Sequence, residues 1–142
     1  MIVLKFSRIF FCLITIILFT VIGCSKEVET EKQKILIQKH INHKYENYSE
    51  VTKDKDVLKA QEIFRNSDWK VIDVKMSRQH EYKLVFQFKN PDIQVKQILY
   101  RVWVNSSDNK LEITKSGRYV QLSKEDSATL YVIITGEKLA NN

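Results

Sequence analysis

The stretch EYKLVFQFK, from Glu81 to Lys89, has the most regular alternation of side chains in the sequence. One parity of this stretch is apolar or aromatic and consists of Tyr82, Leu84, Phe86 and Phe88. The other parity is mostly polar and consists of Lys83, Val85, Gln87 and Lys89. Successive side chains of a β-strand point to opposite faces, so a period of two residues predicts a strand. We expect its aromatic face to lie in the core.

The next patterned stretch, QILYRVWVN from Gln97 to Asn105, is apolar on both faces. Asn90-Pro91-Asp92 separates it from the first strand, and this tripeptide favours a turn. A strand with two apolar faces lies in the middle of a sheet, or it presents a patch to a partner. We expect one of these two positions for this strand.

Shorter stretches extend the strand pattern in both directions along the chain. The further predicted strands are Lys34–Ile41, Ser49–Thr52, Trp69–Met76, Leu111–Thr114 and Tyr119–Leu122. The polar sequence NHKYENYS between the first two of them predicts a turn region.

Two stretches of the sequence have apolar residues at the spacing of an α-helix. Val57, Ala60 and Phe64 share one face of a predicted helix from Lys55 to Arg65, and Asp54 is its expected N-cap. A closing helix follows the capping-box sequence SKED at positions 123–126. Its apolar spacing includes Ser127, Leu130, Tyr131 and Ile134, and Gly136 is its expected left-handed C-cap.

The order of these elements is ββ-α-βββββ-α. This order predicts an α+β fold, in which an antiparallel sheet has two helices packed on one face. Residues 34–142 are expected to form a single domain, because a chain of this length buries enough surface for one core.

The N-terminus has the features of an export signal. Lys5 and Arg8 provide a positive start without an acid, and residues 9–24 form an uncharged stretch of 16 residues. A membrane-spanning helix needs about 20 apolar residues, so this length favours a signal peptide. An uncleaved anchor helix is the alternative interpretation.

The end of the apolar run, Val21-Ile22-Gly23-Cys24, resembles the lipobox of bacterial lipoproteins. The resemblance implies that the Cys24 thiol takes up a diacylglycerol and that residues 1–23 are removed as a lipoprotein signal peptide. Residues 24–33 are then a polar, lipidated tether. Two acyl chains hold a protein stably on a bilayer, so the expected location is the extracytoplasmic face of the bacterial cell membrane. Cys12 lies in the removed segment, which leaves no pair for an internal disulfide.

The charge of the chain argues against nucleic acid as a partner. The 23 basic and 17 acidic residues give a net charge of +6, which falls to +4 without Lys5 and Arg8. Nucleic-acid-binding domains usually concentrate much more positive charge in a patch or stripe. The expected partners are therefore the membrane, through the lipid anchor, and a protein or cell-envelope ligand.

Three segments of the C-terminal part resemble the YhfM-like small lipoproteins of bacilli. The resemblance covers about the last three quarters of the mature chain, and it rests on Trp69, Met76-Ser77-Arg78, Tyr82, Tyr100, Trp103, Tyr119, Leu122 and Leu130. Members of the family tend to have prolines where this chain has Gln79-His80. The resemblance supports the fold and the anchoring, and it implies no catalytic residue.

The candidate ligand or partner surface consists of Arg78, Arg101 and Trp103. If the aromatic face of the Glu81–Lys89 strand lies in the core, Arg101 and Trp103 are expected on the outer face of the sheet. An aromatic ring flanked by cations there would form a platform for a glycan, peptide or protein. The alternative is the reversed orientation, with Trp103 in the core and Tyr100 outside.

The sequence contains few candidates for catalytic residues. A hydrolase built on the His80 loop with Ser77 is one alternative function, but the surrounding sequence does not resemble a nucleophile elbow. We predict no catalytic residue, no metal site at His40 and His43, and no cofactor, since the three glycines form no phosphate-binding loop. A structural subunit of a membrane-associated assembly is a further alternative.

Overall fold

The computed structural model describes residues 32–72 and 74–140. The predicted signal peptide (1–23), the lipidation site Cys24 and most of the predicted tether lie outside the described residues. The elements in the described range are β1 (Gln33–Ile41), β2 (Lys44–Val51), α2 (Asp54–Asn66), β3 (Tyr82–Phe88), β4 (Leu99–Asn105), β5 (Lys110–Lys115), β6 (Arg118–Gln121) and α3 (Lys124–Thr135). Neither of these helices is long and apolar enough to cross a bilayer.

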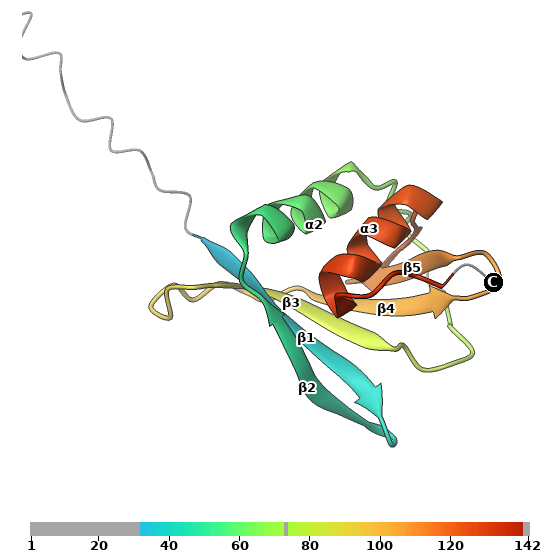
Figure 1. Cartoon of the computed structure of the whole chain (residues 1–142), viewed down its shortest axis with the longest axis horizontal. Coiled ribbons are helices and arrows are strands. Elements are labelled where there is room, and N and C mark those ends of the chain that lie inside the picture. The colour runs from blue at the N-terminus through green and yellow to red at the C-terminus, as the bar shows by residue number, and fades with distance from the viewer. Residues whose placement is uncertain (1–31, 73, 141–142) are drawn as a thin grey trace, which may run out of the picture. The chain divides into compact units, whose positions relative to one another are not determined.

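The strands form one sheet with the order β2-β1-β3-β4-β5-β6, and every neighbouring pair is antiparallel (Figure 1). The predicted α+β fold with an antiparallel sheet and two helices is therefore confirmed. β3 and β4 occupy the two middle positions, and of the two alternatives predicted for β4 the central position is the one observed.

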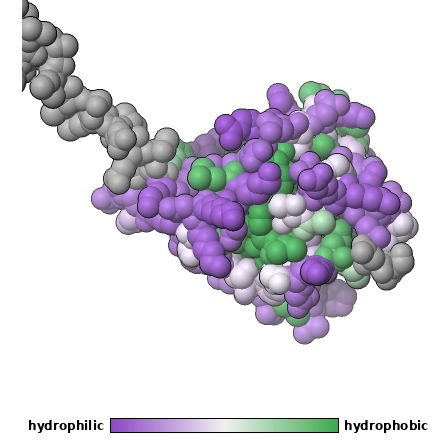
Figure 2. Space-filling model, turned by 45° about the horizontal axis from the view of Figure 1, so that its top comes forward, coloured by the Kyte–Doolittle hydropathy of each residue, from purple (hydrophilic) through white to green (hydrophobic). Residues whose placement is uncertain are grey.

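The core lies between one face of the sheet and the two helices. The register places Leu84 of β3 between Ile37 of β1 and Tyr100 of β4, so these side chains share a face. The buried residues of that face and of the helices form one cluster, which contains Ile35, Ile37, Val51, Val57, Ala60, Ile63, Phe64, Tyr82, Leu84, Tyr100, Val102, Leu111, Ile113, Val120, Leu122, Leu130 and Ile134. Figure 1 shows α2 and α3 side by side over this sheet. Hydrophilic residues dominate the surface visible in Figure 2, with hydrophobic ones gathered near its middle.

The first hairpin is tighter than the sequence predicted. The turn consists of Asn42 and His43, both with positive φ (48° and 66°), which is the conformation of a two-residue type I′ turn. β2 therefore begins at Lys44, and the prediction that residues 44–48 are a turn region is wrong. Their polar side chains are compatible with a strand because β2 lies at the edge of the sheet, where most of its residues stay exposed.

Asp54 is not the N-cap of α2, which corrects the prediction. Lys53 occupies the cap position without a side-chain hydrogen bond, and Asp54 starts the helix. The Asp54 carboxylate instead binds Lys89 and Lys32, at 2.8 and 3.1 Å. Hydrogen bonds from Lys89 and then Lys32 lower the pKa of Asp54.

The predicted strand from Trp69 to Met76 does not form. In its described part only Lys70 joins the sheet, through a two-bond bridge to Tyr119 of the short edge strand β6. Beyond Lys70 the chain leaves the edge, and Ile72, Val74 and Met76 line a pocket on the outer face instead of extending the core. The sheet of the described range thus has six strands, one fewer than predicted.

The closing helix begins and ends where the sequence predicted. The Ser123 side chain accepts a hydrogen bond from the Asp126 amide at 3.1 Å, and Gly136 has a left-handed φ of 75°. Ser127 is fully buried, and its hydroxyl accepts a hydrogen bond of 2.9 Å from the Leu111 amide. This bond joins α3 to β5 inside the core.

Replacing Ser127 should therefore destabilise the fold more than its small size suggests. In Ser127→Ala the buried Leu111 amide has no partner, and an unsatisfied buried donor costs about 1–3 kcal/mol. Urea denaturation should show this loss of unfolding free energy. Thr129→Ala, on a less buried position of the same helix, should change it by no more than about 0.5 kcal/mol. Equal effects of the two substitutions would contradict the assigned role of Ser127.

Candidate functional site

The pleat of β4 decides between the two orientations predicted for its aromatic residues. Tyr100 lies in the core, where its ring stacks on Phe64 of α2 with centroids 4.5 Å apart. Trp103 is three residues further along the strand, so its side chain lies on the opposite, outer face. The orientation with Trp103 outside the helix-facing core is therefore the one observed.

Trp103 is nevertheless not exposed. Only 5% of its surface is accessible, because residues of the segment between α2 and β3 cover it. Its indole N–H donates to the Arg78 carbonyl at 2.9 Å, and the His80 ring meets it edge-on at 5.3 Å. The expectation of an open aromatic platform is therefore wrong, because this segment covers the indole ring.

Arg78 holds that segment in place. Its guanidinium donates to the Glu81 carboxylate and, at 2.7 Å, to the Val104 carbonyl of β4. The second Glu81 oxygen accepts from the Val104 amide at 2.8 Å. Arg78 thus has a structural partner, the Glu81 carboxylate, with which it forms an ion pair at the surface.

His80 is a buried side chain between two aromatic rings. Tyr45 of β2 stacks on it at 4.6 Å and also donates its hydroxyl proton to the His80 carbonyl at 3.0 Å. Nε2 of His80 is buried and has no hydrogen-bond partner among the described residues. Burial, followed by the positive charges of Lys83 and Arg101, lowers the pKa of His80 to about 4. The ring is therefore neutral at neutral pH.

The outer face carries a pocket of about 640 Å³, which we call the outer pocket. Its lining consists of Ile72, Val74, Met76, Ser77, Arg78, Gln79, His80, Arg101, Trp103, Thr114, Gly117 and Arg118. The three residues that the sequence singled out, Arg78, Arg101 and Trp103, all belong to this lining. Arg118 was missed, although the turn sequence KSGR marks its position, because only the antiparallel pairing of β5 with β6 brings it to this face.

The described lining is cationic. It contains three arginines and no Asp or Glu, while Asp73 lies outside the described residues. Arg101 and Arg118 are exposed, and neither guanidinium forms a hydrogen bond or ion pair within residues 32–72 and 74–140. These two groups are therefore free to bind an anion.

The hydrolase and metal arrangements are not assembled in the part of the chain that the structure describes. Glu81 binds Arg78 and Val104, and no hydrogen bond links the His80 ring to Ser77 or Glu81. His40 and His43 meet edge-on at 6.4 Å, but in the described range no group of three or more His, Cys, Asp or Glu side chains is placed to hold a metal ion.

Comparisons of the chain with models of protein families, with curated proteins and with solved structures each found no match.

The buried state of His80 predicts a stability that depends on pH. The unfolded chain binds a proton at His80 near pH 6.5, whereas the folded chain binds it only near pH 4. The stability is therefore complete above about pH 6.5 and falls as the pH decreases toward 4, by about 2–3 kcal/mol. Urea denaturation across this range should show the decrease, and His80→Gln should reduce it.

His43→Asn is the control for this experiment, because His43 is exposed and asparagine tolerates its positive φ. This variant should keep the pH dependence of the parent. An unchanged pH dependence in His80→Gln would contradict the assignment.

Proposed function

We propose that this protein is a lipid-anchored binding protein of the extracytoplasmic face of the bacterial cell membrane, and that its outer pocket binds an anionic group of a protein or cell-envelope ligand. The observation that carries this proposal is the pair of guanidinium groups, Arg101 and Arg118, which have no partner among the described residues and lie in a lining without a described acid. The resemblance to small lipoproteins of bacilli agrees with the proposal and adds no activity to it.

The chemistry of the lining favours a carboxylate or phosphate. A guanidinium group presents planar, paired donors that match the oxygens of these anions, and such charge-assisted hydrogen bonds are among the strong ones. The positive field is also visible in its effect on His80, whose pKa Lys83 and Arg101 depress in addition to burial. Because Trp103 and the Arg78 ion pair fix the floor and one wall, an anion would bind without reordering these groups.

The proposed anchor would keep the pocket near the membrane. Gln33, where β1 begins, is nine positions after Cys24, and an extended chain of this length spans about 30 Å at most. The ligand would therefore be a component of the envelope close to the bilayer, or a protein that is bound there.

A structural subunit of a membrane-associated assembly is the second candidate. Val71 is 82% exposed and Ile72, which lines the outer pocket, is 45% exposed, although both are large apolar residues. A partner protein would cover these side chains. In that case Val71→Ser would reduce recovery of a crosslinked partner and leave anion binding intact.

Anion binding is tested by titrating the full chain with inorganic pyrophosphate. Trp69→Phe leaves Trp103 as the single tryptophan, so its fluorescence reports on the outer pocket. Arg101→Gln should weaken binding about tenfold or more, since a hydrogen bond to a charged group contributes about 1.5–3 kcal/mol.

Arg65→Gln is the matched control, because Arg65 is the one arginine of the described range outside the outer pocket. It should leave the affinity within about twofold of the parent. Equal losses in the two arginine variants, or an absence of saturable binding by the parent, would overturn the anion-binding proposal.

Anchoring is tested at the cysteine. Cys24→Ser removes the only sulfur at the proposed cleavage point, so it should abolish incorporation of a labelled fatty acid and leave an unprocessed precursor. Cys12→Ser should be labelled and processed like the parent. Normal labelling of Cys24→Ser in intact-mass analysis would refute the lipid anchor.

A further inference from the structure

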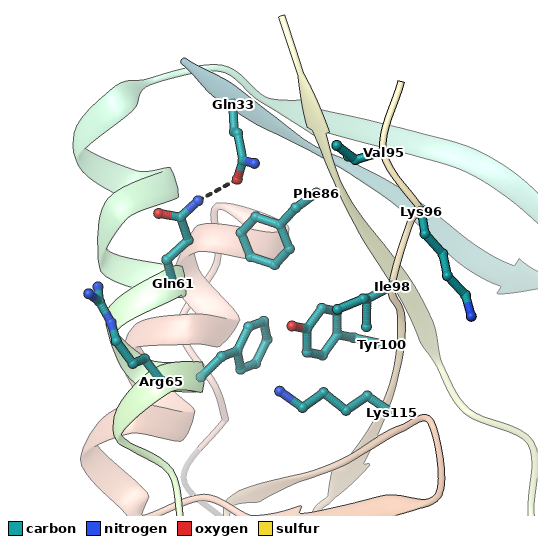
Figure 3. Close-up of a pocket in the computed structure, with 10 residues that line it drawn as sticks. Gln33, Gln61, Arg65, Phe86, Val95, Lys96, Ile98, Tyr100 and Lys115 are labelled. Atoms are coloured by element: carbon teal, nitrogen blue, oxygen red, sulfur yellow. Dashed lines mark hydrogen bonds between the residues drawn. The ribbon is translucent and has the colours of Figure 1, made fainter. Parts of the chain in front are cut away.

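The helix side of the sheet carries a second pocket of about 350 Å³, which we call the inner pocket (Figure 3). Its lining comes from the start of β1, from α2, from the middle strands, from residues 95–98 and from the end of β5: Gln33, Gln61, Phe64, Arg65, Phe86, Val95, Lys96, Ile98, Tyr100 and Lys115. None of these residues lines the outer pocket.

One wall of the inner pocket is aromatic. The rings of Phe64 and Tyr100 stack almost in parallel, at 7°, and Phe86 meets them edge-on at 5.8 and 5.7 Å. Val95 and Ile98 lie beside this wall and remain 53% and 45% exposed. The pocket thus offers rigid apolar surface that the protein itself leaves uncovered, which is the usual floor of a small-molecule site.

Lys115 places a positive charge at the same wall. Its Nζ atom lies 4.1 Å from the centre of the Trp69 ring and 5.2 Å from that of Tyr100. It forms no ion pair with any carboxylate of the described range. Burial, and then the charge of Arg118, lower the pKa of Lys115. This ammonium group has therefore lost part of its hydration and gained only aromatic faces in exchange.

Tyr100 supplies a hydrogen-bond donor next to this charge. Burial raises the pKa of Tyr100, which keeps its hydroxyl protonated, and the hydroxyl forms no hydrogen bond within the described range. In Figure 3 the Tyr100 hydroxyl and the Lys115 ammonium point the same way, toward α2. An ammonium group and a hydroxyl donor side by side form a site for one anionic oxygen pair.

The other residues of the lining are compatible with an anionic ligand. The described lining contains no acid, and Arg65 and Lys96 also line the pocket, with their charged ends turned away from Tyr100 and Lys115 (Figure 3). At the far end Gln61 donates a hydrogen bond to Gln33, which joins α2 to β1. The pocket therefore has an anion-binding end, an apolar wall and a polar but uncharged end.

We propose that the inner pocket binds a small amphipathic anion, in which a carboxylate or phosphate is attached to an aromatic or branched aliphatic body. The anionic group pairs with Lys115 and the Tyr100 hydroxyl, and the body packs on Phe86, Val95 and Ile98. A volume of about 350 Å³ is at the lower end of the range for ligand pockets, which limits the bound part to a small group. The chemistry is shared by free organic acids and by the headgroup region of anionic lipids.

Because the chain has two tryptophans, the fluorescence of each one can report ligand binding at one pocket. Trp103→Phe leaves Trp69, which touches Lys115, as the single fluorophore in the full chain. Three probes with the same body are compared: 3-phenylpropionate, 3-phenylpropan-1-ol and 3-phenylpropylamine. We expect saturable quenching or enhancement with the carboxylate, at least tenfold weaker binding of the alcohol, and no binding of the amine.

Two variants separate the anion contact from a purely structural role. Lys115→Gln should weaken phenylpropionate binding at least fivefold and leave the affinity for the alcohol within twofold, because only the charged probe uses the ammonium group. Lys110→Gln, at the other end of the same strand, is the matched control and should bind both probes like the parent. Equal binding of the three probes, or an unchanged carboxylate affinity in Lys115→Gln, overturns the proposal.

The same assay distinguishes the two sources of the ligand and the two pockets. Competition by phosphatidylglycerol vesicles, with none by phosphatidylcholine vesicles, assigns the inner pocket to a lipid headgroup, whereas no competition by either assigns it to a free acid. Arg101→Gln should leave phenylpropionate binding unchanged. A failure at Trp69 would therefore refute the inner pocket alone, and a failure of pyrophosphate binding at Trp103 would refute the outer pocket alone.

Discussion

The pleat of the central strand β4 is the constraint on which the rest of the structure depends. Because side chains alternate along a strand, Tyr100 and Trp103 must lie on opposite faces of the sheet. Tyr100 completes the core against Phe64, and Trp103 becomes the floor of the outer face. Each of the two pockets is built around one of these rings, so a single strand register positions both.

The connection between α2 and β3 contacts both faces of the sheet. At its start Trp69 donates to the Phe64 carbonyl at 2.7 Å and completes the aromatic cluster on the helix side. At its end Arg78 accepts, through its carbonyl, the hydrogen bond from Trp103 on the outer face. Of the described residues from 69 to 76 only Lys70 bridges to the sheet, yet the connection shapes the surroundings of both tryptophans. It stabilises the domain by covering aromatic surface rather than by adding a strand.

The distribution of charge separates structural from available cations. Lys34, Lys89 and Arg78 bind acids of the domain, and these exposed pairs fix side-chain positions more than they stabilise the fold. Arg101, Arg118 and Lys115 have no such partners in the described range, and they lie at the two pockets. The modest net charge of +6 therefore conceals two local sites where positive charge is unbalanced. Net charge indicates only the solubility of a protein and the general class of its partners. The local arrangement of these cations suggests which chemical groups a ligand would carry.

The sequence by itself determined the fold class, the face of β3 that enters the core and both ends of α3, and it left a central place as one of two alternatives for β4. These features depend on local patterning and capping, which the chain specifies within a few residues. It also selected Arg78, Arg101 and Trp103. Only the tertiary structure decided that residues 72 and 74–80 lie over the outer face, that Trp103 is buried, and that Arg118 and Lys115 join pockets. A strand needs an edge to pair with and a pocket needs several elements at once, and both depend on contacts between residues far apart in the chain.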